Sequence, residues 1–189
     1  IALRGMPEDY DEWAQAGNSG WDWACVLPFF KRLERDLDFG SEDFHGDSGP
    51  ITIRRYPHDE MEPQQQAFLQ TATALGYPEC ADANDPNSYG AGPQPMNKLG
   101  RLRISAAVGY LAPARLRSNL HIRPDTSVRR LLFKGSRCTG AEVQPSHLPD
   151  GDMVSHVTAR LVILCAGALM SPTILLRSGI GATGQLAQL

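Results

Sequence analysis

The longest apolar run of the chain, Leu161 to Met170, constrains the fold more than any other feature. Its first part, Leu161–Leu164, is apolar at every position, which is typical of a strand buried on both faces of a parallel sheet. Gly167 ends this strand, and Ser171-Pro172 opens a helix that carries Ile174. Strand, tight turn and helix in this order indicate a nucleotide-binding unit of a doubly wound sheet. The run is too short to span a bilayer, which needs about 20 residues, so we expect no transmembrane segment.

The first half of the chain predicts three helices. Pro7 suits a first helical position, and Gly17 ends that helix. Asp22 is the expected N-cap of the second helix. The third opens at Glu62-Pro63 and ends at Gly76, and its apolar face is formed by Ala67, Phe68, Thr71, Ala72 and Leu75.

Several short segments predict strands. Alternation predicts a half-buried strand over Ile51–Tyr56. Further along, Leu120–Arg123, Val128–Phe133 and Cys138–Val143 are separated by turn-forming residues and predict an antiparallel meander. The irregular segment Asp82–Gly100 is long for a connection within a domain, and connections of this length usually have a function.

Composition and charge exclude several classes of protein. Apolar residues make up 42% and charged residues 21%, which excludes a disordered chain or a collagen-like polymer. The net charge is −3, and the basic stretch 98–137 holds only two aromatic residues, Tyr110 and Phe133. Nucleic-acid binding needs aromatic platforms among the bases, so we expect no nucleic-acid partner.

Cysteine and histidine give no pattern of a metal or disulfide site. The four cysteines are far apart in sequence and form no C-x-x-C, which predicts reduced thiols in a cytoplasmic protein. No two of the five histidines have the i, i+4 spacing of a helical metal site, so we expect surface histidines and no metal. In particular, His45-Gly46 is predicted to be a loop tip. The cysteines are Cys25, Cys80, Cys138 and Cys165, and the histidines are His45, His58, His121, His147 and His156.

Motifs of nucleophilic or phosphate chemistry are also absent from the sequence. It contains neither a G-x-S-x-G elbow nor a Walker-type phosphate loop. Gly90-Ala91-Gly92 begins like a dinucleotide fingerprint, but Pro95 takes the third glycine position. The adjacent acids Glu42/Asp43 and Asp59/Glu60 are expected to be solvated. The residues alone therefore indicate an α/β domain with one nucleotide-binding strand–turn–helix unit.

Three stretches, taken together, resemble the glucose–methanol–choline (GMC) flavin oxidoreductases. Arg4–Glu34 resembles the segment that follows the first signature of this family. Gly100–Ile122 looks like a family pattern that ends in Asn-Leu, and Ala166–Gly181 is similar to the second signature. Shared elements are Arg4-Gly5, Asp9-Tyr10-Asp11, Trp13-Ala14, Gly20-Trp21, Leu27-Pro28, Arg103, Ser105, Tyr110-Leu111, Gly167, Ser171-Pro172 and Ser178-Gly179-Ile180-Gly181.

The resemblance implies a mixed α/β fold: part of a Rossmann-like FAD-binding domain plus part of an antiparallel-sheet substrate domain. Residues 1–44 would be the end of the first flavin segment with lid helices, 45–102 a substrate-domain segment, and 103–189 a flavin-domain segment. The implied function is oxidation of the CH–OH group of an alcohol, with hydride transfer to flavin N5, proton transfer to a histidine, and oxygen or a quinone as electron acceptor.

The resemblance also implies cofactor-binding residues. Val128 matches a family valine whose backbone holds the adenine edge; the alternative is an ordinary core strand residue. Ala166, Gly167 and Ser171 stand where the buried strand meets the next helix, and ligands of such sheets bind at that end. Small residues there let the adenosine half of FAD approach the backbone. The alternative is a turn that needs glycine only for packing.

Two parts of the family pattern do not occur in this sequence. The G-x-G-x-x-G fingerprint lies upstream of the position of Arg4, and the catalytic histidine lies downstream of the second signature, so we assign no catalytic residue here. We therefore expect an internal fragment that alone binds FAD poorly and is poorly soluble or oligomeric. Two alternatives stay open: a non-catalytic binding or assembly module on the same scaffold, and another two-domain flavoprotein.

Overall fold

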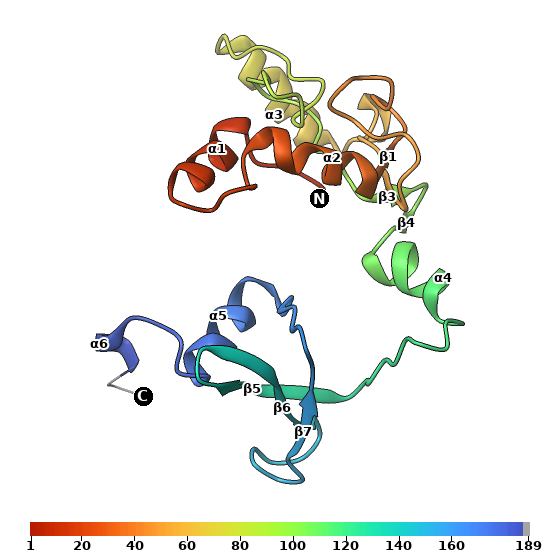
Figure 1. The fold of residues 1–189 in the computed structure, drawn as a ribbon. Coiled ribbons are helices and arrows are strands. Elements are labelled where there is room, and N and C mark those ends of the chain that lie inside the picture. The colour runs from red at the N-terminus through yellow and green to blue at the C-terminus, as the bar shows by residue number, and fades with distance from the viewer. Residues whose placement is uncertain (187–189) are drawn as a thin grey trace. The chain divides into compact units, whose positions relative to one another are not determined.

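A computed structural model describes residues 1–186, and Figure 1 shows their course. The chain divides into two compact units, Ile1–Leu120 and a second unit that begins at His121. Both combine helices and strands, which confirms the mixed α/β class.

The three predicted helices of the first unit are confirmed. They are α1 (Pro7–Gln15), α2 (Trp23–Leu33) and α3 (Pro63–Ala74). The Asp22 side chain caps α2 by accepting a hydrogen bond from the backbone N–H of Cys25, at 3.0 Å. On the apolar face of α3, Ala72 is buried, whereas Phe68 is 66% exposed and Leu75 is 73% exposed. Helix formation here depends on caps and propensity more than on packing.

Strands of the first unit are short and enclose a small apolar core. β1 (Glu34–Asp36) and β2 (Ile51–Ile53) form a parallel pair, and Ile51 and Ile53 pack with Ile104. β2 confirms the start of the predicted strand, whereas β1 was not expected because it has no apolar residue. The remaining elements are the 3₁₀ helix η1 (His58–Glu60), the strands β3 (Lys98–Leu99) and β4 (Leu102–Arg103), the π-helix η2 (Ala107–Leu111) and the short helix α4 (Ala112–Ala114).

Aromatic side chains join α1 to α2. Tyr10 is buried, and its ring lies 5.5 to 5.6 Å from the rings of Trp13, Trp23 and Phe30. The rings of Trp13 and Phe30 meet Tyr10 edge to face and that of Trp23 is tilted, and such contacts favour a defined packing of two helices.

The second unit is a three-stranded antiparallel sheet with one helix packed on it. β5 (Thr126–Lys134) pairs with β6 (Arg137–Pro145), which pairs with β7 (Ser155–Thr158). α5 (Gly167–Arg177) packs against β5, where Ser178 Oγ accepts a hydrogen bond from the Leu131 N–H at 2.8 Å. A short helix, α6 (Thr183–Leu186), follows.

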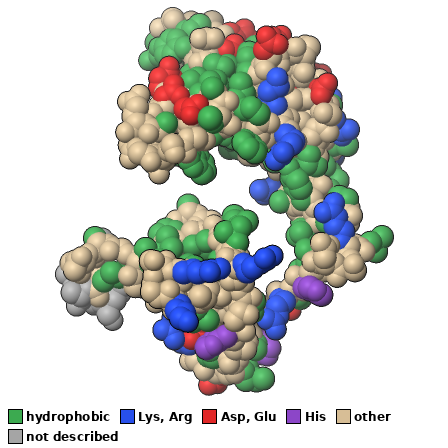
Figure 2. Space-filling model, in the orientation of Figure 1, with side chains coloured by type: hydrophobic (Ala, Val, Ile, Leu, Met, Phe, Trp, Pro, Cys, Tyr) green, Lys and Arg blue, Asp and Glu red, His purple; other side chains and the backbone are tan. Residues whose placement is uncertain are grey.

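Two strand predictions in the second half of the chain are wrong. Leu120–Arg123 and Leu161–Leu164 form no strand, because neither finds a ladder partner within residues 1–186. Leu161 and Ile163 are instead 76% and 78% exposed. Figure 2 shows such apolar side chains on the surface of the second unit. The third strand of the meander is β7, whose four exposed residues gave no apolar pattern.

Among the helices of the described residues, none is both long and apolar enough to cross a membrane.

A close backbone approach after α2 gives a test of this fold. A Cβ on Gly46 would lie 1.9 Å from the Lys31 carbonyl oxygen, so the loop must move to hold any larger residue. We expect Gly46→Ala to lower the free energy of unfolding by about 1–3 kcal/mol or more, as overpacking does. Ser48→Ala, an exposed change in the same loop, should alter it by less than about 0.5 kcal/mol. Equal losses in urea denaturation would contradict this packing.

Candidate functional site

The residues predicted to contact FAD fall on two elements of the second unit. Ala166 is the N-cap of α5, and its N–H donates to Ser171 Oγ at 3.0 Å. Gly167 is the first helical residue, with a φ of +85°. Apart from the adjoining residues and the backbone of α5 itself, no atom of the described residues lies within 4 Å of the position where a Cβ would stand on Gly167, so this side of the backbone is open. Glycine is the residue that adopts this conformation without strain.

Val128 lies apart from these three residues in sequence, on β5. It is half-buried, faces Val143 on β6, and precedes a register shift at Arg129. β5 is an edge strand of the sheet, so its outer backbone groups have no ladder partner within the described residues. Its role in adenine binding stays a prediction.

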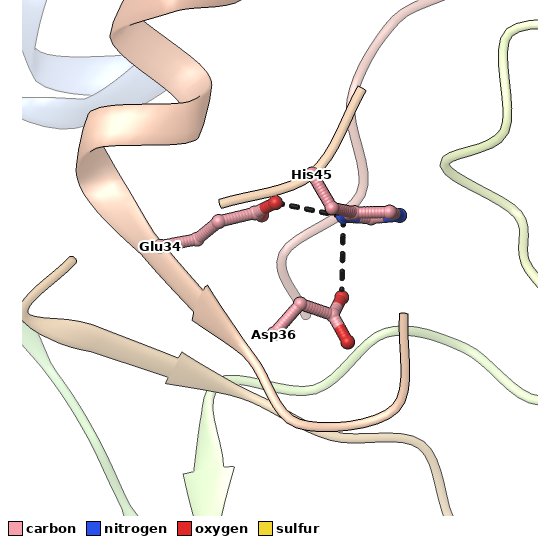
Figure 3. A group of neighbouring side chains, drawn as sticks. All are labelled: Glu34, Asp36 and His45. Carbon is pink, nitrogen blue, oxygen red and sulfur yellow. Dashed lines mark hydrogen bonds and ion pairs between the residues drawn. The ribbon is translucent and has the colours of Figure 1, made fainter. Parts of the chain in front are cut away.

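A buried cluster of charged residues in the first unit was not predicted. Glu34 and Asp36 stand two apart on β1, so their side chains point to the same side while Arg35 is exposed. Figure 3 shows both carboxylates directed at the ring of His45. Its side chain is 0% exposed, so the prediction of a loop tip is wrong.

His45 bridges carboxylates with both ring nitrogens. Nδ1 lies 2.7 Å from Glu34 Oε1 and 3.3 Å from Asp36 Oδ2 (Figure 3). Nε2 lies 2.7 Å from Asp82 Oδ2. The Phe44 ring packs beside the imidazole, with the ring centroids 4.9 Å apart.

Two guanidinium groups complete the cluster. Arg4 pairs with Glu34 and donates to the Phe44 carbonyl at 2.7 Å. Arg55 pairs with both Asp36 and Asp82. With a protonated histidine, three cations face three carboxylates, so the cluster is electrically neutral. The six residues of this ion cluster are Arg4, Glu34, Asp36, His45, Arg55 and Asp82.

Proton affinities in the cluster are strongly displaced. Burial by itself lowers the pKa of His45, but the hydrogen bonds to Asp82 and Glu34 outweigh it and raise the pKa to about 9. Burial raises the pKa of the Asp82 carboxyl, but the bonds from His45, the Asn84 N–H and Arg55 lower it to about 2. Burial also raises the pKa of the Glu34 carboxyl, but the contacts with His45 and Arg4 outweigh it, so this pKa lies below its ordinary value.

This geometry limits the chemistry of His45. At neutral pH both ring nitrogens carry protons that are donated to carboxylates, so the imidazole has no free lone pair to act as a general base. A metal ligand must be neutral histidine as well. Glu34, Asp36 and His45 present ligand atoms within 4.8 Å of one another, but Arg4 and Arg55 already neutralise these carboxylates. The residues present do not fit a metal ion.

One signal in the sequence pointed to this cluster. Two acids with period-two spacing, Glu34 and Asp36, come directly after a helix and before a buried strand, and they put two carboxylates on one side of an extended segment. Their partners Arg4, Arg55 and Asp82 are distant in sequence, and only the tertiary structure brings them together. By contrast, Glu42, Asp43, Asp59 and Glu60 are exposed, which confirms the prediction of solvated acids.

The comparison with protein families identifies the class. A family model described as GMC oxidoreductase matches residues 1–188. The chain belongs to the GMC oxidoreductase family, which confirms the resemblance of its three stretches. GMC oxidoreductases are FAD-dependent, and the predicted cofactor is confirmed at this level.

Curated relatives are similar over nearly the whole chain. A 5-(hydroxymethyl)furfural oxidase of Methylovorus sp. is 42% identical over 98% of this chain and 34% of its own length. An uncharacterized GMC-type oxidoreductase of Rhodococcus erythropolis is 41% identical over 98% of the chain and 36% of its own. Mitochondrial choline dehydrogenase of Mus musculus is 36% identical over 100% of this chain and 30% of its own length. The chain thus spans about a third of the length of these relatives.

A solved structure has the same fold. The pyridoxine 4-oxidase of Mesorbium loti matches with a TM-score of 0.81 and 35% identity, covering 98% of this chain and 35% of that one.

The ion cluster predicts a large difference between two neighbouring arginines. Arg55→Met would leave Asp36 and Asp82 short of a cation inside the protein, and we expect a loss of about 3–5 kcal/mol in unfolding free energy. Arg54 is 46% exposed, with its nearest carboxylate 3.9 Å away at Asp38, so Arg54→Met should cost less than about 1 kcal/mol. Urea denaturation measures both, and similar losses would show that the cluster does not stabilise the unit.

The displaced pKa values predict how stability depends on pH. His45 binds its proton more tightly when folded, so its contribution is complete below pH 6.5 and disappears as the pH rises through about 9. The contribution of Asp82 is complete above pH 3.8 and disappears as the pH falls through about 2. The contribution of the His45 proton to the free energy of unfolding is on the order of 3 kcal/mol. Unfolding free energies from pH 6 to 10 should fall in the wild type and stay flat in His45→Gln.

Proposed function

We propose that this chain is part of an FAD-dependent oxidoreductase that acts on the CH–OH group of an alcohol. The observation that carries the proposal is the match of residues 1–188 to the GMC oxidoreductases. The names of relatives favour the same chemistry, because choline dehydrogenase and 5-(hydroxymethyl)furfural oxidase are both named for compounds with an alcohol group.

The N-terminus of α5 is the part of the chain that best fits FAD. We propose that Ala166, Gly167 and Ser171 contact the adenosine half of the cofactor, because the space beside Gly167 is open and the start of a helix favours polar or anionic groups. We propose further that the outer backbone edge of β5 at Val128 binds the adenine. An edge strand supports this, since backbone donors and acceptors there are not used by another strand.

When bound, FAD supplies the acceptor for the hydride of the alcohol, at flavin N5. The proton of the hydroxyl group needs a base with a free lone pair. His45 is unsuited because both of its ring nitrogens bind carboxylates. From the resemblance to the family, we propose that the catalytic histidine lies outside residues 1–189.

The test uses the protein at its natural length. Purified protein should show flavin absorbance and reduce that flavin with alcohols, with turnover in the presence of oxygen or a quinone. Gly167→Val should bind FAD about tenfold more weakly or worse, because a β-branched residue is strained at φ +85° and fills the open space.

Gly76→Val is the matched control, since Gly76 lies in the first unit, has a φ of +90°, and has no described neighbouring atom within 4 Å of its Cβ position. Its FAD affinity should equal that of the wild type. Natural-length protein without flavin, or with flavin that no alcohol reduces, would refute the proposal. Residues 1–189 alone should bind FAD poorly, since Leu161, Ile163 and Leu169 are exposed.

A further inference from the structure

The ion cluster is connected to the beginning of the chain by two routes that start at His45. On one route, Asp82 accepts the Asn84 N–H at 3.0 Å, and the Asn84 amide accepts the Arg4 N–H at 3.0 Å and donates to the Ala2 carbonyl at 3.1 Å. On the other, Glu34 binds the Arg4 guanidinium. The two routes meet at Arg4. His45, Asp82, Asn84, Arg4 and Glu34 therefore form a closed ring of hydrogen-bonded residues.

All members of this ring are shielded from water. Glu34, Asp82 and Asn84 are at most 8% exposed, and the Arg4 side chain is 4% exposed. The charged groups that face His45 are Glu34 and Asp36 from β1 and Asp82 from the segment after α3, with Arg4 and Arg55 behind them. Asp38 approaches Arg55 from the rim at 3.7 Å.

We propose that His45 is a proton-dependent clamp that holds the segment Ala2–Arg4 in place through Asp82 and Asn84. The reason is the count of donors. An imidazolium has two N–H groups, and here each meets a carboxylate at 2.7 Å. A neutral imidazole has only one N–H group, so the carboxylate of either Glu34 or Asp82 then faces the lone pair of the unprotonated ring nitrogen at the same distance.

Loss of the proton changes the charge of the cluster from zero to minus one. The repulsion displaces a carboxylate, and both candidates hold Arg4, one directly and one through Asn84. The Ala2 N–H keeps its bond to the Pro95 carbonyl at 2.8 Å, so the segment loosens locally and does not detach. This clamp goes beyond the proposed function, in which His45 has no part.

Hydrogen exchange of backbone amides tests the clamp in the protein at its natural length. After correction for the intrinsic pH dependence of exchange, wild-type peptides that cover residues 2–10 and 82–91 should lose protection between pH 7 and 10. In His45→Gln they should exchange about tenfold faster or more already at pH 7, because a bond between charged groups is lost. His58→Gln, a change at an exposed histidine of the same unit, should match the wild type.

α3 serves as the internal reference for this experiment. If His45→Gln accelerates exchange in α3 as much as in residues 2–10, the effect is general destabilisation and the clamp is refuted. Wild-type protection of residues 2–10 that does not change from pH 7 to 10 would refute it as well.

A second variant separates the clamp from the charge of the cluster. Asn84→Ala removes the two bonds to Ala2 and Arg4 but leaves all six charged side chains in place. It should loosen residues 2–10, while the ring NMR signals of His45 still titrate near pH 9. Unchanged exchange of residues 2–10 in Asn84→Ala would contradict the route through Asn84.

Discussion

The interaction on which the first unit depends is the charge balance around His45. Its apolar core is small, with Ile51, Ile53 and Ile104 at its centre. Charged contacts among Arg4, β1, His45, Arg55 and Asp82 join segments that are far apart in sequence. Buried ion pairs add little net stability compared with apolar residues of the same shape, but breaking one is costly. The ion cluster therefore determines where these segments lie more than how stable they are.

The second unit is organised by local contacts. β5 and β6 form a hairpin and β7 extends it, so every strand pairing among the described residues of this unit joins neighbours in sequence order, and α5 packs back on β5. The segment Leu161–Leu164 has the composition of a central strand but has no partner within the described residues. A parallel strand needs neighbours that are distant in sequence. The relatives are about three times longer than this chain, and the exposure of Leu161 and Ile163 agrees with a surface that other parts of such a protein cover.

The two notable groups of residues have different kinds of chemistry. At the start of α5, open space lies beside backbone groups and small side chains, an arrangement suited to a bulky polar ligand. In the ion cluster every carboxylate is already paired, an arrangement suited to holding backbone segments. A conspicuous buried histidine is thus separate from the chemistry proposed for the family, and its two carboxylate partners are the physical reason.

The sequence by itself determined the elements whose signals are local. Pro7, Asp22 and Glu62-Pro63 marked helix starts because caps act within one turn, and the hairpin of β5 and β6 followed from β-rich segments around Gly135. Three stretches of sequence, taken together, were enough to indicate the family. Only the tertiary structure decided that His45 is buried, that β1 and β7 are strands, and that Leu161–Leu164 is not. Each of these depends on a partner far along the chain or on a hydrogen-bonding neighbour, which the pattern of apolar residues within a segment does not encode.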